Sequence, residues 1–262
     1  MSGEGSARRG SRVRLGALWV DVLRFADALA EIERLVRAGN GGMVFTPNVD
    51  HVVNAESDSK LRAAYQAAEL ILADGQPLVW ASRLLRTPLP QKISGSDLVP
   101  RVLIQAGVFR WRVYLLGGAE GVAEMAGEQL REMGIELAGA EGPRVGVEPR
   151  EDEPQLIERV RAAKADVVLV GLGSPKQERF IHRAAPLLKP AVLFGVGASL
   201  DFLAGKAKRA PLWMSNVGLE WIYRLMQEPL RLAPRYLLND PWFAVIVWQM
   251  LRTPRAERLK AR

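Results

Sequence analysis

The sequence predicts an α/β protein with a mostly parallel, Rossmann-like sheet flanked by helices. Short apolar runs recur along the chain, longer amphipathic stretches separate them, and most of the runs end in glycine or a polar residue. Continuous apolar runs are typical of parallel strands, because these are buried on both faces of the sheet. We expect this fold, in one or two lobes, over residues 13–205.

The apolar runs give the expected strands, and parallel strands place their carboxyl ends at one edge of the sheet. The runs are 43–48, 70–74, 111–118, 166–173 and 191–197, and helical spacing of apolar residues marks 25–37, 119–133 and 154–164 between them. Ligands of open parallel sheets bind beyond the carboxyl ends of the strands. The candidate site residues at these ends are Thr46, Asn48, Asp74, Gly117, Gly118, Gly171, Gly173, Ser174, Gly195 and Gly197.

The two ends of the chain differ from this core. Residues 1–12 are rich in Gly, Ser and Arg and are expected to form a disordered tail. Residues 206–262 hold the whole net charge of +7 and four of the seven tryptophans. Basic residues mixed with tryptophan suit an anionic membrane surface. Nucleic acid and a merely solvated basic tail are the alternatives.

Four prolines, Pro211, Pro229, Pro234 and Pro241, are expected to break this C-terminal part into short helices. The apolar run 242–251 would be about 15 Å long as a helix, half of a hydrocarbon core of roughly 30 Å. We therefore do not expect it to span a bilayer. It could pack on the core or lie in the membrane interface.

Composition and missing motifs exclude several chemistries. The chain has no cysteine, so it has no disulfide and no thiolate chemistry, and its two histidines, His51 and His182, cannot make a multi-histidine metal site. The glycine-rich segment 117–121 lacks the Lys-Ser/Thr of a P-loop and does not fit GxGxxG. A nucleotide triphosphatase and a nicotinamide dehydrogenase are therefore disfavoured.

Two strand ends carry the chemistry that the residues alone suggest. Asp74 ends the run LILAD and precedes Gly75, so it either caps the helix near Pro77 or acts as a base at the rim of a cleft. In GLGSPKQE, Ser174 is expected to be the N-cap, with Pro175 at the first helical position and Glu178 near a capping-box position. Capping leaves Lys176 and Gln177 unexplained, which predicts a phosphate or sugar site.

Taken together, the segments TPNVDHVVNA, ADGQPLVW, YLLGG, VGLGSPKQE, GVGASLDFLAGKAKRAP and GLEWIYRLMQEPLR resemble a known family. In this order they are similar to the WecG/TagA/CpsF glycosyltransferases, glycosyltransferase family 26, over about residues 15–241. Members transfer a sugar from a nucleotide diphosphate to a polyprenyl-diphosphate-linked sugar. The best-known members add β-linked N-acetylmannosamine to undecaprenyl-diphospho-N-acetylglucosamine, a step in wall teichoic acid and related glycopolymers.

The resemblance implies an inverting transfer and gives the candidate residues their roles. Asp74 would be the catalytic base, with Gly75 leaving space beside its carboxylate. No DxD motif is present, so loop N–H groups and basic side chains would stabilise the departing diphosphate without a metal or a cofactor. The expected substrate-binding residues are Thr46, Asn48, Gly171, Gly173, Ser174, Lys176, Gln177 and Gly197. Those expected for the lipid diphosphate are Arg209, Arg224, Arg231 and Arg235.

The expected partners follow from the same resemblance. They are a UDP-sugar donor, a polyprenyl-diphosphate-linked acceptor and an anionic membrane surface on which residues 206–262 dock, and no nucleic acid. The chain would be a peripheral protein on the cytoplasmic face of the plasma membrane. Relatives self-associate, which leaves a homo-oligomer open. The alternatives are another UDP-hexose or a uronic acid donor for exopolysaccharide, or a nucleotide-sugar-binding protein without catalysis.

Overall fold

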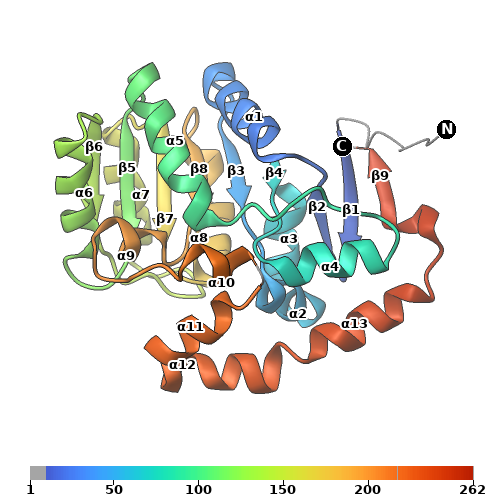
Figure 1. Cartoon of the computed structure of the whole chain (residues 1–262). Coiled ribbons are helices and arrows are strands. Elements are labelled where there is room, and N and C mark those ends of the chain that lie inside the picture. The colour runs from blue at the N-terminus through green and yellow to red at the C-terminus, as the bar shows by residue number, and fades with distance from the viewer. Residues whose placement is uncertain (1–9, 217, 262) are drawn as a thin grey trace.

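A six-stranded parallel sheet forms the centre of the computed structural model, which describes residues 10–216 and 218–261 (Figure 1). The strand order is β4-β3-β8-β7-β5-β6. The strands are β3 (Gly42–Phe45), β4 (Leu70–Ile71), β5 (Val113–Gly117), β6 (Leu137–Glu141), β7 (Val167–Gly171) and β8 (Val192–Gly195). The predicted parallel sheet is confirmed. Of these six strands only β6 had no predicted counterpart, because its sequence LAGAE has a single large apolar residue.

Helices cover both faces of this sheet. The helices α1 (Phe25–Ala38), α5 (Gly95–Phe109), α6 (Val122–Glu132) and α9 (Ser199–Leu203) contribute to one buried cluster. The other face carries α2 (Val49–Ser57), α3 (Ser59–Ala67), α7 (Glu153–Ala162) and α8 (Lys176–Ala184). Strand β3 is buried on both sides because Val44 enters the first cluster whereas Met43 and Phe45 enter the second. The predicted helices at 25–37, 119–133 and 154–164 are confirmed as α1, α6 and α7.

A small antiparallel sheet, β2-β1-β9, joins the start of the fold to the end of the chain. Its strands are β1 (Ser11–Leu15), β2 (Leu18–Asp21) and β9 (Leu259–Ala261). Buried Arg12 pairs with Asp21 at 3.0 Å, and the second oxygen of Asp21 accepts from the Ile71 N–H of β4 at 2.8 Å. Ser11 and Arg12 therefore belong to the fold, and the predicted boundary at residue 13 is two residues late. Residues 1–9, expected to be disordered, lie outside the described residues.

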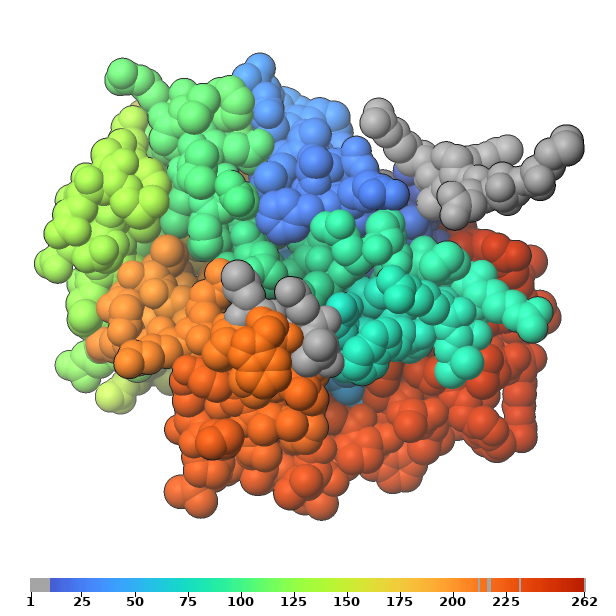
Figure 2. All heavy atoms as spheres, viewed as in Figure 1, coloured from blue at the N-terminus to red at the C-terminus, as the bar shows by residue number. Residues whose placement is uncertain are grey.

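The C-terminal part, residues 206–262, is called the appendage from here on, and it is mostly built of short helices. These are α10 (Leu212–Asn216), α11 (Glu220–Gln227), α12 (Pro229–Pro234), the π-helix η2 (Arg235–Asn239), α13 (Trp242–Leu251) and η3 (Arg255–Arg258). The prediction that prolines separate short helices is confirmed. The appendage forms the lower part of the molecule in the views of Figures 1 and 2. Its last strand, β9, returns to the core.

Helix α13 is apolar on both sides, and only one side is buried. Phe243, Ile246, Val247 and Met250 pack on the core, together with residues of α4 (Gln76–Leu84) and the small sheet. The opposite side exposes Trp242, Val245, Trp248 and Leu251. Run 242–251 thus packs on the core and still presents tryptophan to the surface. Over the described ranges, every helix is too short or too polar to cross a membrane.

Candidate active site

A cavity of about 650 Å³ lies at the carboxyl ends of β3, β4, β7 and β8, with appendage residues on its other wall. Its position follows from the strand order. The chain leaves β3 toward β4, whereas it leaves the adjacent β8 toward α9, which packs against α6. The connections of two neighbouring strands therefore diverge, which opens a crevice at the switch point of the sheet. The volume is typical of a small-ligand site.

Asp74 lies in this cavity, held there by its backbone. Its N–H donates to Pro47 O at 2.8 Å, and the preceding carbonyl, of Ala73, accepts from Ile93 N at 2.7 Å. Burial raises the pKa of the Asp74 carboxyl to about 6, and the negative charge of Glu220 adds to the rise. The positive charges of Arg224 and Lys92 oppose it, which limits the increase in pKa. A carboxyl with this pKa can exchange a proton near neutral pH.

The helix after Asp74 is not capped by the Asp74 side chain. Helix α4 begins at Gln76, Gly75 occupies the N-cap position, and no side-chain hydrogen bond caps it among the described residues. Gly75 has φ +112°, a backbone conformation that favours glycine. That Gly75 also leaves space beside the Asp74 carboxylate stays a prediction.

Six of the eight expected substrate-binding residues line the cavity: Thr46, Asn48, Gly173, Ser174, Gln177 and Gly197. The other two are not among its lining residues. Gly171 packs beneath it, where a Cβ would come within 2.8 Å of Gly197 O, and Lys176 is exposed at the start of α8. The glycines at the end of β5, Gly117 and Gly118, also lie outside the lining.

The capping arrangement predicted for Ser174 and Glu178 is wrong. Helix α8 begins at Lys176 with Pro175 in the N-cap position, and the buried Ser174 Oγ has no hydrogen-bond partner among the described residues. A capping box instead begins α2. The Asn48 side chain accepts from Asp50 N at 3.1 Å, and Asn48 N donates to His51 Nδ1 at 3.2 Å. Histidine at the third position falls outside the Ser/Thr-x-x-Glu/Gln pattern.

The four expected phosphate-binding arginines divide into three groups. Arg224 and Arg235 line the cavity, and Arg235 Nη2 donates to Asn48 Oδ1 at 2.8 Å. Arg209 is not among the lining residues, but it pairs with Asp97 and donates to Ser96, which lines the cavity. Arg231 belongs to α12, and its side chain lies outside the described part of the chain.

Comparison with known families identifies the chain. The model described as "Glycosyl transferase WecG/TagA/CpsF family" matches residues 13–257. The chain belongs to this family. A relative from Bacillus spizizenii, named N-acetylglucosaminyldiphosphoundecaprenol N-acetyl-beta-D-mannosaminyltransferase, is 34% identical over 209 residues, which is 79% of each protein.

As a member of the WecG/TagA/CpsF family, the chain is a glycosyltransferase, and the resemblance inferred from its motifs is confirmed. The family makes glycans of the cell surface, so the expected reaction class is also correct. The α/β fold described above is the scaffold on which this glycosyltransferase places its cavity.

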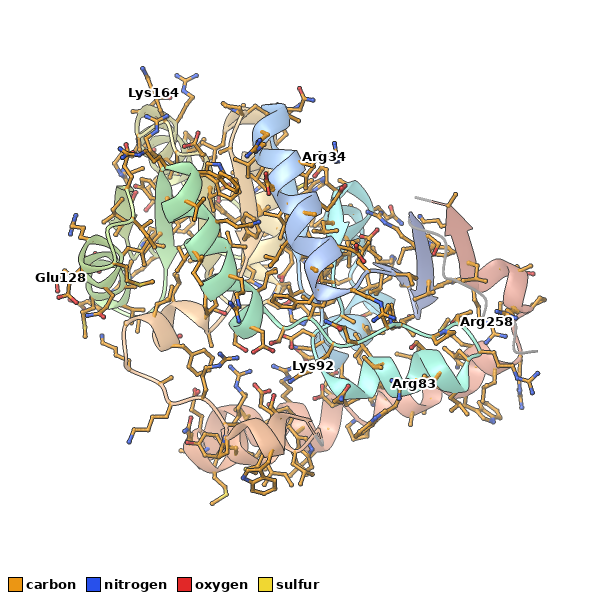
Figure 3. The ribbon with its side chains drawn as sticks, turned by 45° about the horizontal axis from the view of Figure 1, so that its top comes forward. Arg34, Arg83, Lys92, Glu128, Lys164 and Arg258 are labelled. Atoms are coloured by element: carbon orange, nitrogen blue, oxygen red, sulfur yellow. The ribbon has the colours of Figure 1, made fainter. Side chains whose placement is uncertain are left out.

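Lys92 is a cationic residue of the cavity that the sequence analysis did not predict. It lies between the core and the appendage (Figure 3). Its Nζ donates to Ser215 Oγ and lies 3.8 Å from Glu220 Oε2, which also accepts from Ser215 Oγ at 2.8 Å. Lys92 precedes α5 in an irregular segment, with no apolar run or motif to mark it. Only the position of the appendage explains its role.

The arrangement supplies one base and several cations. Asp74 can accept a proton, and Lys92, Arg224 and Arg235 can bind phosphate oxygens at the same cavity. Over residues 10–216 and 218–261, no group of three or more His, Asp or Glu side chains is arranged to hold a metal ion. The three cations suit transfer chemistry in which fixed positive charges stabilise a leaving anion.

Proposed function

We propose that this glycosyltransferase moves N-acetylmannosamine from UDP-N-acetylmannosamine to N-acetylglucosaminyl-diphospho-undecaprenol, for a teichoic acid-like surface polymer. The name of the Bacillus spizizenii relative contains this acceptor and this sugar. The observation that carries the proposal is the position of Asp74. It is a carboxylate with a pKa of about 6 inside a cavity that is also lined by Lys92, Arg224 and Arg235.

The proposed reaction is a single displacement that inverts the anomeric carbon. Asp74 accepts the proton of the acceptor hydroxyl while that oxygen forms a bond to C1 of the donor sugar. The bond between C1 and the diphosphate oxygen breaks, and its electron pair leaves with UDP. A base with a pKa near 6 is largely ionised at pH 7 and is a stronger base than an ordinary aspartate.

We assign the two halves of the cavity to the two substrates. Thr46, Asn48 and Gln177 are the proposed donor residues, with Gly173, Ser174 and Gly197 beside them. Arg224 and Arg235 of the appendage are assigned to the acceptor diphosphate, which arginine can bind in a bidentate way. Lys92 would stabilise charge on the leaving UDP. No metal or cofactor is required by this scheme.

We also propose that the appendage binds an anionic membrane surface on the cytoplasmic face. The polyprenyl tail of the proposed acceptor stays in the bilayer, so the cavity has to reach the membrane surface. The net charge of +7 in residues 206–262 supports this. So do the exposed side chains of Trp213, Trp221, Trp242 and Trp248, because tryptophan favours the membrane interface.

The test is a panel of nucleotide sugars against a short-chain polyprenyl-diphospho-N-acetylglucosamine acceptor, with products identified by mass. We expect transfer from UDP-N-acetylmannosamine and release of UDP in equal amount. Transfer only from a uronic acid or another hexose would contradict the donor and leave the glycosyltransferase chemistry intact. Nucleotide binding without release of UDP from any donor would contradict the proposed reaction.

A further inference from the structure

The amide of Gln177 is fixed at both ends by hydrogen bonds to other groups of the protein. Its Oε1 accepts from Gly197 N at 2.9 Å, and its Nε2 donates to Glu178 Oε1 at 2.7 Å. An N–H group only donates and a carboxylate only accepts, so these two partners determine which way the amide faces. Gly195 leaves room for it, because a Cβ there would lie 3.3 Å from Gln177 Nε2.

Glu178 is a buried carboxylate, with 1% of its surface exposed, and it does not line the cavity. Its Oε2 has no hydrogen-bond partner among the described residues. Burial alone would raise its pKa, but the hydrogen bond and the charge of His51 outweigh burial and hold the pKa below the usual range. His51 Nε2 lies 3.3 Å from Glu178 Oε1. Glu178 can therefore stay ionised and accept from Gln177, because the hydrogen bond from His51 Nε2 stabilises the carboxylate.

The other side of the His51 ring holds the second donor residue. Nδ1 accepts from Asn48 N at 3.2 Å and lies 2.8 Å from Asn48 Oδ1. Asn48 is the N-cap of α2, which follows β3, and Gln177 is in the first turn of α8, which follows β7. Strand β8 separates β3 from β7 in the sheet, so the His51–Glu178 pair connects the starts of these two helices at the wall of the cavity.

We propose that His51 and Glu178 are positioning residues that hold Asn48 and Gln177 in place for the nucleotide-sugar donor. This inference rests on the proposed function, since it requires Asn48 and Gln177 to contact the donor. The pair acts on the donor half of the site through its hydrogen bonds to Gln177 and Asn48, and His51 itself borders the cavity beside Asn48. Among the described residues, one of the two N–H groups of Gln177 Nε2 has a protein partner, which leaves the other for a ligand.

A merely structural role would have a different signature. Replacing a buried ion pair changes stability by an amount that varies in sign, without preference for one substrate. A positioning role instead predicts weaker binding of UDP and a higher KM for the donor, with the KM for the acceptor little changed.

The experiment compares His51→Gln, Glu178→Leu and Glu178→Gln in the full chain, with His182→Gln as the matched control. His182 is the second histidine of the chain and lies outside the cavity lining. UDP affinity is measured by calorimetry, and KM is measured separately for UDP-N-acetylmannosamine and for the acceptor. We expect His51→Gln and Glu178→Leu to weaken UDP binding about tenfold, the effect of losing one charge-assisted hydrogen bond. Glu178→Gln, which keeps the acceptor oxygen, should stay within about threefold of wild type.

The double variant His51→Gln/Glu178→Leu should bind UDP about as well as the weaker single variant, because the two residues act as one unit. Additive losses would overturn the proposal, and so would equal increases in donor and acceptor KM. If the variants fail to fold, the inference is tested instead by NMR of the wild-type protein, through the imidazole signals of His51 and His182. Saturating UDP should shift the His51 signals and leave those of His182 in place, and unchanged His51 signals would overturn the inference.

These outcomes separate the two proposals. If wild type transfers sugar and binds UDP but the His51 variant binds UDP as well as the His182 variant does, only the inference fails. If wild type neither binds UDP nor transfers sugar, the proposed function fails and the inference fails with it.

Discussion

Asp74 is held in surroundings that favour its protonated form. The carboxyl lies in the cavity and is largely enclosed by protein. The like charge of Glu220 raises its pKa further, while Lys92 and Arg224 reduce the effect without cancelling it. A base of this kind is produced by burial together with a neighbouring carboxylate, as is common at catalytic sites. Both its reactivity and its effect on stability follow from that environment.

Asp74→Asn is expected to abolish transfer, because an amide cannot accept the acceptor proton. We expect kcat to fall by at least 100-fold, the usual contribution of a general base, with UDP affinity nearly unchanged. In wild type, kcat/KM should fall as the pH is lowered through about 6, since Asp74 then becomes protonated. Initial rates from pH 5 to 8 measure this. Glu128→Gln, at an exposed position of α6, is the control, and near-normal rates in Asp74→Asn would rule out Asp74 as the base.

The same substitution should stabilise the fold near neutral pH. The folded-state pKa of about 6 exceeds the ordinary value of 3.8, so the folded state binds this proton more tightly than the unfolded state does. The resulting contribution to stability is complete below pH 4 and is lost as the pH rises through 6. At pH 7.5, Asp74→Asn should therefore raise the free energy of unfolding by about 1–3 kcal/mol. Urea titration measures it, and no gain over Glu128→Gln would contradict the raised pKa.

At the scale of secondary structure, patterns local in sequence were the ones that could be predicted. The apolar runs of β3, β4, β5, β7 and β8 identify strands whose burial comes from cover on both faces. Strand β9 has three residues, all exposed, and exists because β1 pairs with it from the other end of the chain. Such pairing depends on the folded topology and leaves no pattern in the strand itself.

The site residues also divide into those that a sequence pattern predicts and those that only the folded structure brings together. Asp74, Thr46, Asn48 and Gln177 each end or follow a recognisable strand, so the parallel-sheet rule places them at one edge. Lys92, Ser215 and Glu220 meet only because the appendage folds back over the core. A contact across more than 100 residues between irregular segments has no periodicity to read, and sequence reasoning could not find it.

The packing of α13 on the core can be tested at the turn between β1 and β2. Gly16 has φ +59°, and a Cβ there would lie 2.5 Å from Glu56 Oε1 and 3.0 Å from Val52 Cγ1, both of α2, and 3.1 Å from Ile246 Cγ2 of α13. Its N–H also donates to Met250 Sδ at 2.9 Å. We expect Gly16→Ala to lower the free energy of unfolding by about 2–5 kcal/mol, combining backbone strain with overpacking.

Gly39→Ala is the matched control for this test. Gly39 also has positive φ, +66°, but nothing lies within 4 Å of its Cβ position. Gly39→Ala should therefore lower the free energy of unfolding only by the backbone strain, about 1–2 kcal/mol. Urea unfolding of both variants measures the difference, and equal losses would mean that α2 and α13 do not pack tightly against this turn.

At the scale of the whole molecule, charge and apolar surface are divided unevenly. The appendage carries the net charge of +7 and lies at the edge of the sheet where the strands end, next to the cavity. The side of α13 that faces away from the core exposes Trp242 and Trp248. If this surface docks on a bilayer, the cavity opens close to the membrane, where a lipid-linked diphosphate is held.

The double variant Trp242→Ser/Trp248→Ser is therefore expected to bind anionic liposomes at least tenfold more weakly than wild type, because it removes two half-exposed aromatic groups. The control is Val108→Ser/Met133→Ser, whose side chains are exposed to a similar extent, 69% and 57%. Val108 and Met133 lie at the C-terminal ends of α5 and α6, the helices that precede β5 and β6. They are therefore at the edge of the sheet where the strands begin, opposite to the edge that carries the cavity. Flotation with phosphatidylglycerol vesicles measures binding. Binding of wild type should also weaken with added salt, because surface charge is screened. Equal losses in both double variants would mean that membrane binding is not directed by the appendage, and the proposed docking face would have to be abandoned.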